Sequence, residues 1–425
     1  MTSDNSPDLA YVWIWLPGAT QPIVAGAITR DGNRFIFNYV RSYLEREDAI
    51  PVYEPELPLV RGAIFPAPGL QQASALRDAA PDAWGRRVIL NQLMGAQGRD
   101  ADPDRLDEMT YLLESGSDRI GGLDFQRSAT EYVPRASQSA SLEELMQAAS
   151  MVESGVPLTP KLEQALFHGS SLGGARPKAM IESGNRKFIA KFSSSTDTYN
   201  VVKAEYIAMR LAACAGLNVA PVLLRHTAGK DVILIERFDP IQSHAGWQRR
   251  LMVSALTIFG LDEMMARYAS YEDLTDIIRQ RFDAPKETLR ELFGRLVFYI
   301  ICGNTDDHAR NHAAFWDGKK LSLTPAYDIC PQGRSGNEAT QEMLIIGENR
   351  MSNLAVCLSS AAKFLLSERE AIDVITHCIR TVHENWAEIC SEASLSEVDR
   401  NFLWGRVFLN PFIFEGAPES IVHLR

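Results

Sequence analysis

The chain of 425 residues is long enough for two or three domains, and its 46% hydrophobic content is that of an ordinary folded protein. Its net charge of −11, from 43 basic and 54 acidic residues, argues against a broad nucleic-acid surface, so we expect no direct nucleic-acid binding. No apolar run approaches the roughly 18 residues of a membrane span and no secretory signal opens the sequence, so we expect a cytoplasmic protein without membrane contact.

The cysteines lie far apart in the sequence, and no two of them form a C-x-x-C pair. This spacing indicates neither a zinc ribbon nor a disulfide framework. We therefore expect buried thiols at all six positions, which are Cys214, Cys302, Cys330, Cys357, Cys378 and Cys390.

The N-terminal part is predicted to be rich in strands. A β-branched and aromatic run covers residues 11–16, and residues 22–40 read as two strands joined at Asp31-Gly32. Helical patterns follow at 80–90, with a proline near the first turn, and at 106–114. Residues 128–140 are polar, contain a proline and show no apolar period, which is typical of a linker.

A second unit is predicted to begin at Ser141, because Ser141 and Glu144 form a capping-box pattern that opens a helix to about Val152. A short helix at 161–167 precedes a glycine-rich stretch. The segments 177–181 and 186–192 read as a hairpin. A helix at 200–215 and a strand at 232–238 complete this part.

From residue 249 onward long helical patterns dominate, as at 271–282 and 285–302, with few strand signals. The predicted fold class is α+β, with a small mixed lobe before a larger helical lobe. The predicted domains are a β-rich subdomain at 1–135, the small lobe at 141–245 and the helical lobe at 246–425.

The first stretch that carries chemistry is HGSSLGGARPK at 168–178. Glycines let backbone N–H groups wrap anionic oxygens, so this loop could bind phosphate. A serine- and glycine-rich loop alone is more often a simple turn. Neither a Walker motif nor the dinucleotide-binding glycine pattern is present, which disfavours those two folds.

Lys191 lies inside the otherwise apolar strand FIAKF, and Glu205 lies among apolar residues of the following helix. A buried ammonium is costly unless an anion pairs with it. In protein kinases a strand lysine held by a helix glutamate binds the α- and β-phosphates of ATP. The alternative interpretation is a solvated edge-strand lysine and an unrelated surface glutamate.

The segment GNTDDHARN at 303–311 follows the apolar run 296–302. Asp306 precedes Asn311 by five positions, the spacing of the kinase catalytic loop, in which Asp accepts the hydroxyl proton and Asn binds Mg²⁺. Asp328 follows 17 positions after Asn311 in the apolar stretch LTPAYDI, and oxygen ligands of this kind suit Mg²⁺. The order of these features along the chain favours a kinase.

Two other readings of this segment are possible. Asp306 and Asp307 could cap a helix, with Asn304 in a turn. His308 and His312 are spaced i, i+4 and could bind zinc if the segment were helical, although no glutamate stands between them as in H-E-x-x-H. Neither reading uses Lys191, Glu205 or the glycine-rich loop.

Taken together, these residues resemble the HipA family of bacterial toxin serine/threonine kinases. The resemblance covers most of the chain and is strongest from about 165 to 332. One departure is Arg310, where the family more often has lysine. The motifs that carry the resemblance are DAAPDAWGRR at 78–87, SSLGGARPKA at 170–179, FIAKF at 188–192, IERFD at 235–239, GNTDDHARN at 303–311 and LTPAYDI at 323–329.

The resemblance implies a bilobal protein-kinase-like fold and a set of site residues. Asp306 would be the catalytic base, Asn311 and Asp328 would bind Mg²⁺, and Glu205 would form a structural ion pair. Ser171 would be the autophosphorylation site, with the adjacent Ser170 as an alternative. The ATP-binding residues would be Ser170, Ser171, Leu172, Gly173, Gly174, Ala175, Lys191, Glu236, Phe238 and His308, with Glu236 and Phe238 meeting the adenine through their backbone.

The resemblance also implies ATP and Mg²⁺ as cofactors and two kinds of partner. The first is a protein substrate, such as an aminoacyl-tRNA synthetase or another translation factor. The second is a HipB-like DNA-binding antitoxin. Two alternatives to a protein kinase are a non-catalytic nucleotide-sensing protein that docks to its antitoxin and a small-molecule kinase.

Overall fold

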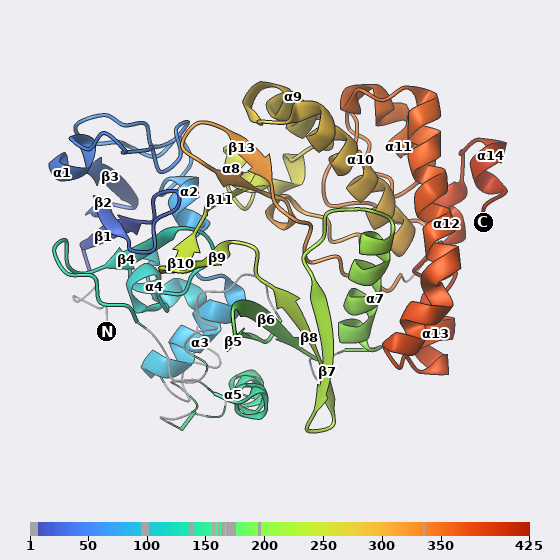
Figure 1. Ribbon diagram of the computed structural model, residues 1–425, viewed down its shortest axis with the longest axis horizontal. Coiled ribbons are helices and arrows are strands. Elements are labelled where there is room, and N and C mark those ends of the chain that lie inside the picture. The colour runs from blue at the N-terminus through green and yellow to red at the C-terminus, as the bar shows by residue number, and fades with distance from the viewer. Residues whose placement is uncertain are drawn as a thin grey trace. The chain divides into compact units, whose positions relative to one another are not determined.

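The computed structural model describes residues 7–94, 102–135, 140–154, 156, 158–159, 162, 166, 176–193, 197–334 and 336–425. It forms two compact units, each assembled from separate stretches of the chain (Figure 1). The first unit comprises residues 1–194, 226–253 and 315–319, and the second comprises 195–225, 254–314 and 320–425.

The first unit opens with an antiparallel sheet in the order β3-β2-β1-β4. The β2–β3 hairpin turns at Gly32, whose φ of +60° suits a residue without a Cβ atom. The predicted first strand and the predicted hairpin are therefore confirmed. The strands are β1 (Leu9–Ile14), β2 (Ile23–Asp31), β3 (Arg34–Tyr39) and β4 (Leu123–Gln126).

Short helices connect the strands of this sheet, and both predicted helices are present. The Asp107 side chain accepts a hydrogen bond from the Thr110 amide at 2.8 Å and so caps the start of α4. The helices are α1 (Arg41–Leu44), α2 (Ser74–Arg77), α3 (Ala83–Met94), the 3₁₀ turn η2 (Pro103–Arg105) and α4 (Glu108–Glu114).

The predicted capping box at the start of α5 (Leu142–Ser154) is confirmed. The Ser141 amide donates to Glu144 Oε2 at 3.0 Å, and the Glu144 amide donates to Ser141 Oγ at 3.2 Å. The short helix expected at 161–167 lies outside the described residues, except for positions 162 and 166.

A second sheet in this unit contains β5 (Lys178–Ser183), β6 (Arg186–Phe192) and β8 (Lys230–Glu236), with β6 between the other two. The predicted β5–β6 hairpin is confirmed, and its turn passes through Gly184 at φ +62°. The strands β9 (Pro240–Ser243) and β10 (Gly246–Arg249) form a separate antiparallel pair. The chain passes from one unit to the other within β7 (Val222–Thr227) and within β11 (Leu251–Ser254).

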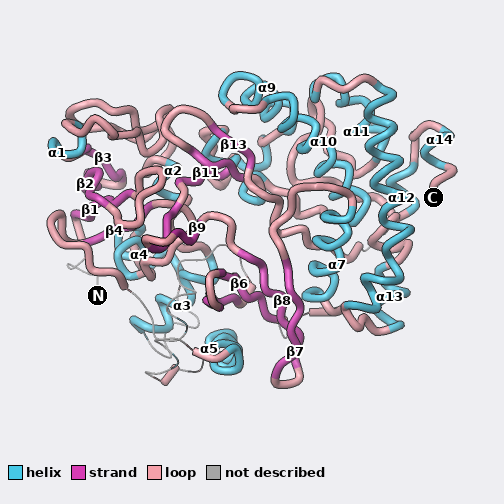
Figure 2. The backbone as a smooth tube through the Cα atoms, in the orientation of Figure 1, coloured by secondary structure: helices cyan, strands magenta, loops and turns pink. Residues whose placement is uncertain are grey.

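The second unit is mainly helical, and its core forms around α10 (Pro285–Cys302). Proline at the first helical position and Gly303 after the last one set the ends of this helix. From Leu292 to Cys302 every residue is buried, as expected for a helix that is apolar on all sides. It packs against α7 (Val201–Cys214), α9 (Tyr271–Arg281) and α12 (Glu368–Glu392) (Figure 2).

The remaining elements are short. The strand β12 (Ala313–Trp316) has its first two residues in the second unit and its last two in the first, and β13 (Leu321–Leu323) belongs to the second unit. The others are α8 (Ala255–Ile258), η4 (Ala266–Tyr268), η5 (Ala309–Asn311), α11 (Leu354–Ser360), η6 (Ala361–Phe364), α13 (Glu397–Leu403), η7 (Pro411–Phe414) and α14 (Glu419–Val422).

The expectation for the cysteines holds at five positions and is wrong at one. Cys214 is exposed because it lies at the C-terminal end of α7, while the other five thiols are buried. None of the six is disulfide-bonded. Among the described helices, none is both long enough and apolar enough to span a bilayer.

Candidate active site

The loop that carries Asp306 begins with a tightly specified end to α10. The Gly303 amide donates to Ile300 O at 3.2 Å and the Asn304 amide donates to Tyr299 O at 2.8 Å, which is the Schellman pattern. Gly303 adopts a φ of +72°, and a Cβ atom there would lie 2.8 Å from Val407 O. Only glycine meets both conditions, so the end of the helix fixes where the loop starts.

Asp307 is a buried anchor of this loop. Its side chain is fully buried, accepts a hydrogen bond from the Tyr271 hydroxyl, and lies 2.7 Å from His312 Nε2 through Oδ1. The Asp307 carbonyl also accepts from the Met343 amide at 3.3 Å. The sequence indicated a carboxylate at this position but not this role, because Tyr271 is 36 residues away in the chain.

Asp306 has the opposite environment, since its side chain is exposed at the surface. Its pKa is raised because surrounding protein atoms partly desolvate the carboxylate and because the nearby carboxylates of Asp328 and Glu342 repel its charge. His308 acts in the opposite direction and favours the ionised form. These interactions place Asp306, His308 and Asp328 in one electrostatic cluster within the second unit.

Asn311 is held against the same loop. Its Nδ2 donates to the Asp306 carbonyl at 2.9 Å, and its backbone amide donates to His308 O at 2.8 Å. The side chain is buried, with 7% of the residue exposed. Because the nitrogen is committed to the loop, the oxygen Oδ1 is the atom of this amide that can bind a cation.

Asp328 has an unusual backbone conformation. Its φ of +57° is in the left-handed region, which costs an ordinary residue about 1–2 kcal/mol. The adjacent Tyr327 hydroxyl donates to Arg310 O at 2.7 Å and so joins the Asp328 segment to the Asp306 loop. Strained residues of this kind cluster at functional sites, which supports a role for Asp328 beyond folding.

The buried Arg295 is hydrogen-bonded to the backbone of the segment that precedes Asp328. Its Nη2 donates to Thr324 O at 2.9 Å and to Asn218 O at 3.1 Å, while Nε donates to Glu291 Oε1 at 2.7 Å. A single guanidinium from α10 therefore holds the segment before Asp328 and the segment after α7 together.

The zinc interpretation is not supported by this geometry. The segment is extended at His308 and contains only the 3₁₀ turn η5, so His308 and His312 do not lie one helical turn apart. His312 is buried and bonded to Asp307. In the described part of the chain no group of three or more His, Cys, Asp or Glu side chains could hold a metal ion.

In the first unit, Lys191 lies in the central strand β6 and is 8% exposed, so it is not a solvated edge-strand lysine. Lys178 of β5 stands directly opposite it and is 4% exposed. Like charges placed opposite each other are destabilising unless anionic groups compensate, so two buried ammonium groups here require negative charge nearby. Trp84 Nε1 donates to Lys178 O at 2.9 Å and fixes the start of β5.

The sequence did not lead us to expect a second buried lysine, Lys178, beside Lys191. The signal was present, because a two-residue turn at Gly184-Asn185 pairs Ser183 with Arg186 and, by counting back, Lys178 with Lys191. Glu205 is 2% exposed on α7 of the second unit, so it is not an ordinary surface glutamate. Its ion pair with Lys191 stays a prediction.

The expected hinge follows β8 in the first unit. The Arg237 amide donates to Lys187 O at 2.8 Å, and Glu236 stands opposite Phe188 in the ladder. Because polar groups alternate along an antiparallel strand, the backbone N–H and C=O of Glu236 point away from β6. Phe238 O accepts a hydrogen bond from Arg250 Nη2 at 2.5 Å, which fixes the end of this segment.

The glycine-rich loop lies outside the described residues. The predicted positions Ser170, Ser171, Leu172, Gly173, Gly174 and Ala175 are all in it, so their roles stay predictions.

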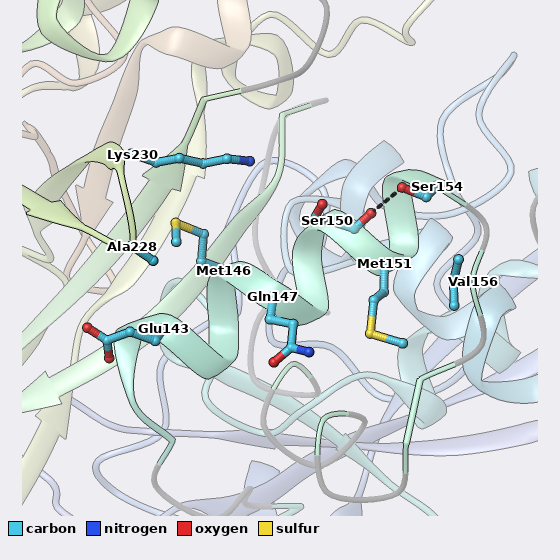
Figure 3. A pocket seen from close by; sticks show the side chains of 9 residues that line it. All are labelled: Glu143, Met146, Gln147, Ser150, Met151, Ser154, Val156, Ala228 and Lys230. Atoms are coloured by element: carbon cyan, nitrogen blue, oxygen red, sulfur yellow. Dashed lines mark hydrogen bonds between the residues drawn. The ribbon is translucent and has the colours of Figure 1, made fainter.

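A separate open pocket of about 430 Å³ lies between one face of α5 and the turn before β8, lined among others by Met146, Met151 and Lys230 (Figure 3). None of the predicted site residues lines this pocket.

Two protein-family models match this chain. It matches the model of the HipA-like C-terminal domain over residues 170–386, slightly more than half of its length, and the model of the HipA N-terminal domain over residues 15–126. This chain belongs to the HipA family. The first match contains Lys191, Asp306, Asn311 and Asp328, and the second ends at β4.

One curated relative is similar to part of this chain. It is 24% identical over 183 residues to the serine/threonine-protein kinase toxin HipA of Shewanella oneidensis, a match that covers 37% of this chain and 42% of that protein. The chain spans about a third to a half of the length of the curated relatives that it matches.

The fold is similar over nearly the whole chain to HipA from Shewanella oneidensis MR-1, solved in a complex of that toxin–antitoxin system with HipB and its operator DNA. The TM-score is 0.68 at 17% sequence identity, and the match covers 95% of this chain and 96% of the other. The mixed α/β fold of this chain is therefore the kinase-like fold of HipA.

The residues present fit the Mg²⁺ that the family implies. Asn311 Oδ1 and the Asp328 carboxylate are hard oxygen donors, and Mg²⁺ usually takes one or two carboxylates and completes its shell with phosphates and water. Partial desolvation is the main cause of the raised pKa of Asp306, and the charges of Asp328 and Glu342 add a repulsion that a divalent cation at Asp328 would relieve.

Proposed function

We propose that this protein is an ATP- and Mg²⁺-dependent serine/threonine protein kinase, the toxin of a toxin–antitoxin system. The observation that carries the proposal is that Asp306 is exposed while the adjacent Asp307 is buried. The same loop holds Asn311 by a hydrogen bond to the Asp306 carbonyl, and Tyr327, next to Asp328, is hydrogen-bonded to the Arg310 carbonyl. Such a loop can present the Asp306 carboxylate to a substrate in a fixed position.

In this proposal Asp306 accepts the proton of the substrate hydroxyl, and its pKa, raised chiefly by partial desolvation, makes it a stronger base than a free aspartate. Asn311 and Asp328 would hold Mg²⁺, which when bound neutralises charge on the phosphates. Lys191 contacts the phosphates, and Lys178 adds a second positive charge on the same face. Most of the rate enhancement then comes from positioning and electrostatics.

Two partners belong to the proposal. One is a protein substrate, for which an aminoacyl-tRNA synthetase or another translation factor is the class that the family suggests. The other is a HipB-like DNA-binding antitoxin, supported by the fold match to HipA solved with HipB and its operator DNA. Any DNA contact would come through that antitoxin, because this chain carries a net charge of −11.

Autophosphorylation at Ser171 is the regulatory part of the proposal, with Ser170 as the alternative. A phosphate there would add about two negative charges to a loop that is proposed to hold the phosphates of ATP. Repulsion would then weaken nucleotide binding and inactivate the kinase.

The test compares Asp306→Asn with Asp373→Asn, an exposed aspartate on α12 that serves as the matched control. With labelled ATP and Mg²⁺, Asp306→Asn is expected to lower phosphotransfer by about 10²- to 10⁴-fold while binding of a fluorescent ATP analogue is kept. The control variant should keep both. Wild-type turnover in Asp306→Asn would overturn the assignment of the base.

The same experiment separates the alternatives. Label on Ser171 or Ser170 supports a protein kinase that modifies itself. Nucleotide binding without label on this protein or on any protein of a lysate supports a nucleotide-sensing interaction protein. Label confined to small molecules of the lysate supports a small-molecule kinase.

A further inference from the structure

A cluster of charged side chains lies between the N-terminal domain and the proposed hinge, and all of it belongs to the first unit. Its centre is Arg237, the residue between Glu236 and Phe238, whose side chain is 1% exposed. The guanidinium donates to Asp118 Oδ1 at 2.9 Å and to both carboxylate oxygens of Asp239, at 3.0 Å and 2.6 Å.

The cluster is continuous with the backbone of the N-terminal domain. Arg237 Nη2 donates to Arg119 O at 2.8 Å, and Asp239 Oδ2 accepts from the Gly121 amide at 3.0 Å. Arg249 is also buried and donates to the carbonyls of four residues in one short segment, namely Ser117, Arg119, Gly121 and Leu123. Five positions of the segment 117–123 are thus hydrogen-bonded to Arg237, Asp239 or Arg249.

β6 contributes to the same cluster. Lys187 Nζ lies 2.7 Å from Asp118 Oδ2, and Lys187 O accepts the Arg237 amide at 2.8 Å. Burial alone would raise the pKa of Asp118, but Arg237, Lys187 and Arg249 together hold that pKa well below its usual range. Asp118 is therefore ionised at neutral pH and binds the hinge and the strand of Lys191 at the same time.

The free energy of buried ion pairs indicates that this cluster fixes the orientation of the backbone more than it adds stability. Removing charges from water costs several kcal/mol per ion, and replacing a buried ion pair by apolar residues is often neutral or stabilising. A bidentate arginine does, however, define one orientation of the backbone that carries it. At position 237 that backbone lies directly between the two residues proposed to meet the adenine.

We infer that Asp118 and Arg237 are positioning residues through which the N-terminal domain sets the hinge for adenine binding. This inference rests on the proposed kinase function, because that function gives the hinge its role. Neither side chain touches the nucleotide. Both act through the backbone of residues 236–238, so a loss of the cluster should weaken nucleotide binding and leave the catalytic loop of the second unit unchanged.

The primary test measures binding of a fluorescent ATP analogue to the full chain. Asp118→Asn is expected to weaken this binding by about tenfold, since a displacement of about 1 Å in a site can cost up to 10²-fold. The matched control is Glu108→Gln. It removes a half-buried carboxylate of the same domain that pairs with Arg86 and is bonded neither to Arg237 nor to the segment 117–123, and it should bind within twofold of wild type.

A second variant and a second measurement keep the inference testable if Asp118→Asn folds poorly. Lys187→Met leaves the Arg237–Asp239 pair in place and is expected to weaken analogue binding two- to fivefold. Hydrogen exchange of the peptide covering 235–240 should rise in both variants and stay at the wild-type level in Glu108→Gln. This exchange readout needs no nucleotide.

The outcomes separate the inference from the proposed function. Weaker binding together with faster exchange at 235–240, absent from the control, supports the inference. A wild type that binds the analogue, with Asp118→Asn and Lys187→Met binding equally well, overturns the inference alone. A wild type that binds no nucleotide overturns the proposed function and the inference with it.

Discussion

Replacing Asp307 with asparagine is a direct test of how the Asp306 loop is held. The new side chain has the same size, and its Oδ1 can still accept from the Tyr271 hydroxyl. Its Nδ2, however, would face His312 Nε2, which now lies 2.7 Å from a carboxylate oxygen. Since a hydrogen bond to a charged group contributes about 1.5–3 kcal/mol and a buried mismatch adds to the loss, we expect a cost of about 2–3 kcal/mol.

The assay is hydrogen–deuterium exchange of the peptide covering 303–313, which reads the local opening equilibrium. A cost of about 2–3 kcal/mol corresponds to roughly 30- to 150-fold faster exchange, because every 1.4 kcal/mol is tenfold. Asp306→Asn is the matched control, the same chemical change one residue away on an exposed side chain. If Asp307→Asn exchanged within threefold of wild type, the buried network would not be what holds the loop.

Two further variants test the backbone of the site. Gly303→Ala should lower the free energy of unfolding by about 2–4 kcal/mol in urea titrations, because it combines a left-handed φ with a Cβ contact of 2.8 Å to Val407 O. Asp328→Gly would relieve the left-handed φ of +57° and is expected to abolish phosphotransfer. In that variant the pKa of Asp306 should also fall in an NMR titration, because removing the Asp328 charge removes a repulsion that disfavours the ionised form.

Local chemistry explains which elements could be predicted. The β2–β3 hairpin, the Ser141–Glu144 capping box and the ends of α10 depend on residues that are neighbours in the chain. Such signals act through a few backbone hydrogen bonds, so a single sequence contains them. The strands β12 and β13 span only four and three residues and are too short for an alternating pattern to be recognised.

The candidate site was predictable to the extent that its chemistry is local. The spacing from Asp306 to Asn311 indicated the loop, and in the structure the Asn311 side chain donates a hydrogen bond to the Asp306 carbonyl. The roles of Asp306 in catalysis and of Asn311 and Asp328 in binding Mg²⁺ stay predictions, as does the three-domain division of the chain. Convergence of Lys191 with the acidic loop likewise stays a prediction.

The supporting contacts could not be predicted because their partners are distant in sequence. Asp118 and Arg237 are 119 residues apart, and Arg295 binds the carbonyl of Thr324 from 29 residues away. No periodicity or spacing rule links such positions. A motif such as IERFD shows that an arginine and an aspartate occur near a strand end, but only the fold shows that both face the segment 117–123.

The two adjacent aspartates show why sequence alone leaves such a loop ambiguous. Asp306 and Asp307 are chemically identical, and each could be assigned as base or as support. In this loop the Asp306 side chain is exposed and the Asp307 side chain is buried, and the His308 amide donates to the Asp306 carbonyl at 3.1 Å, so the chain turns at Asp307. Tyr271 and His312 determine which aspartate is buried, because both are hydrogen-bonded to Asp307. These two partners offset the free energy of removing a carboxylate from water. Burial of Asp307 therefore directs Asp306 outward, and the holding residue determines which residue is available for chemistry.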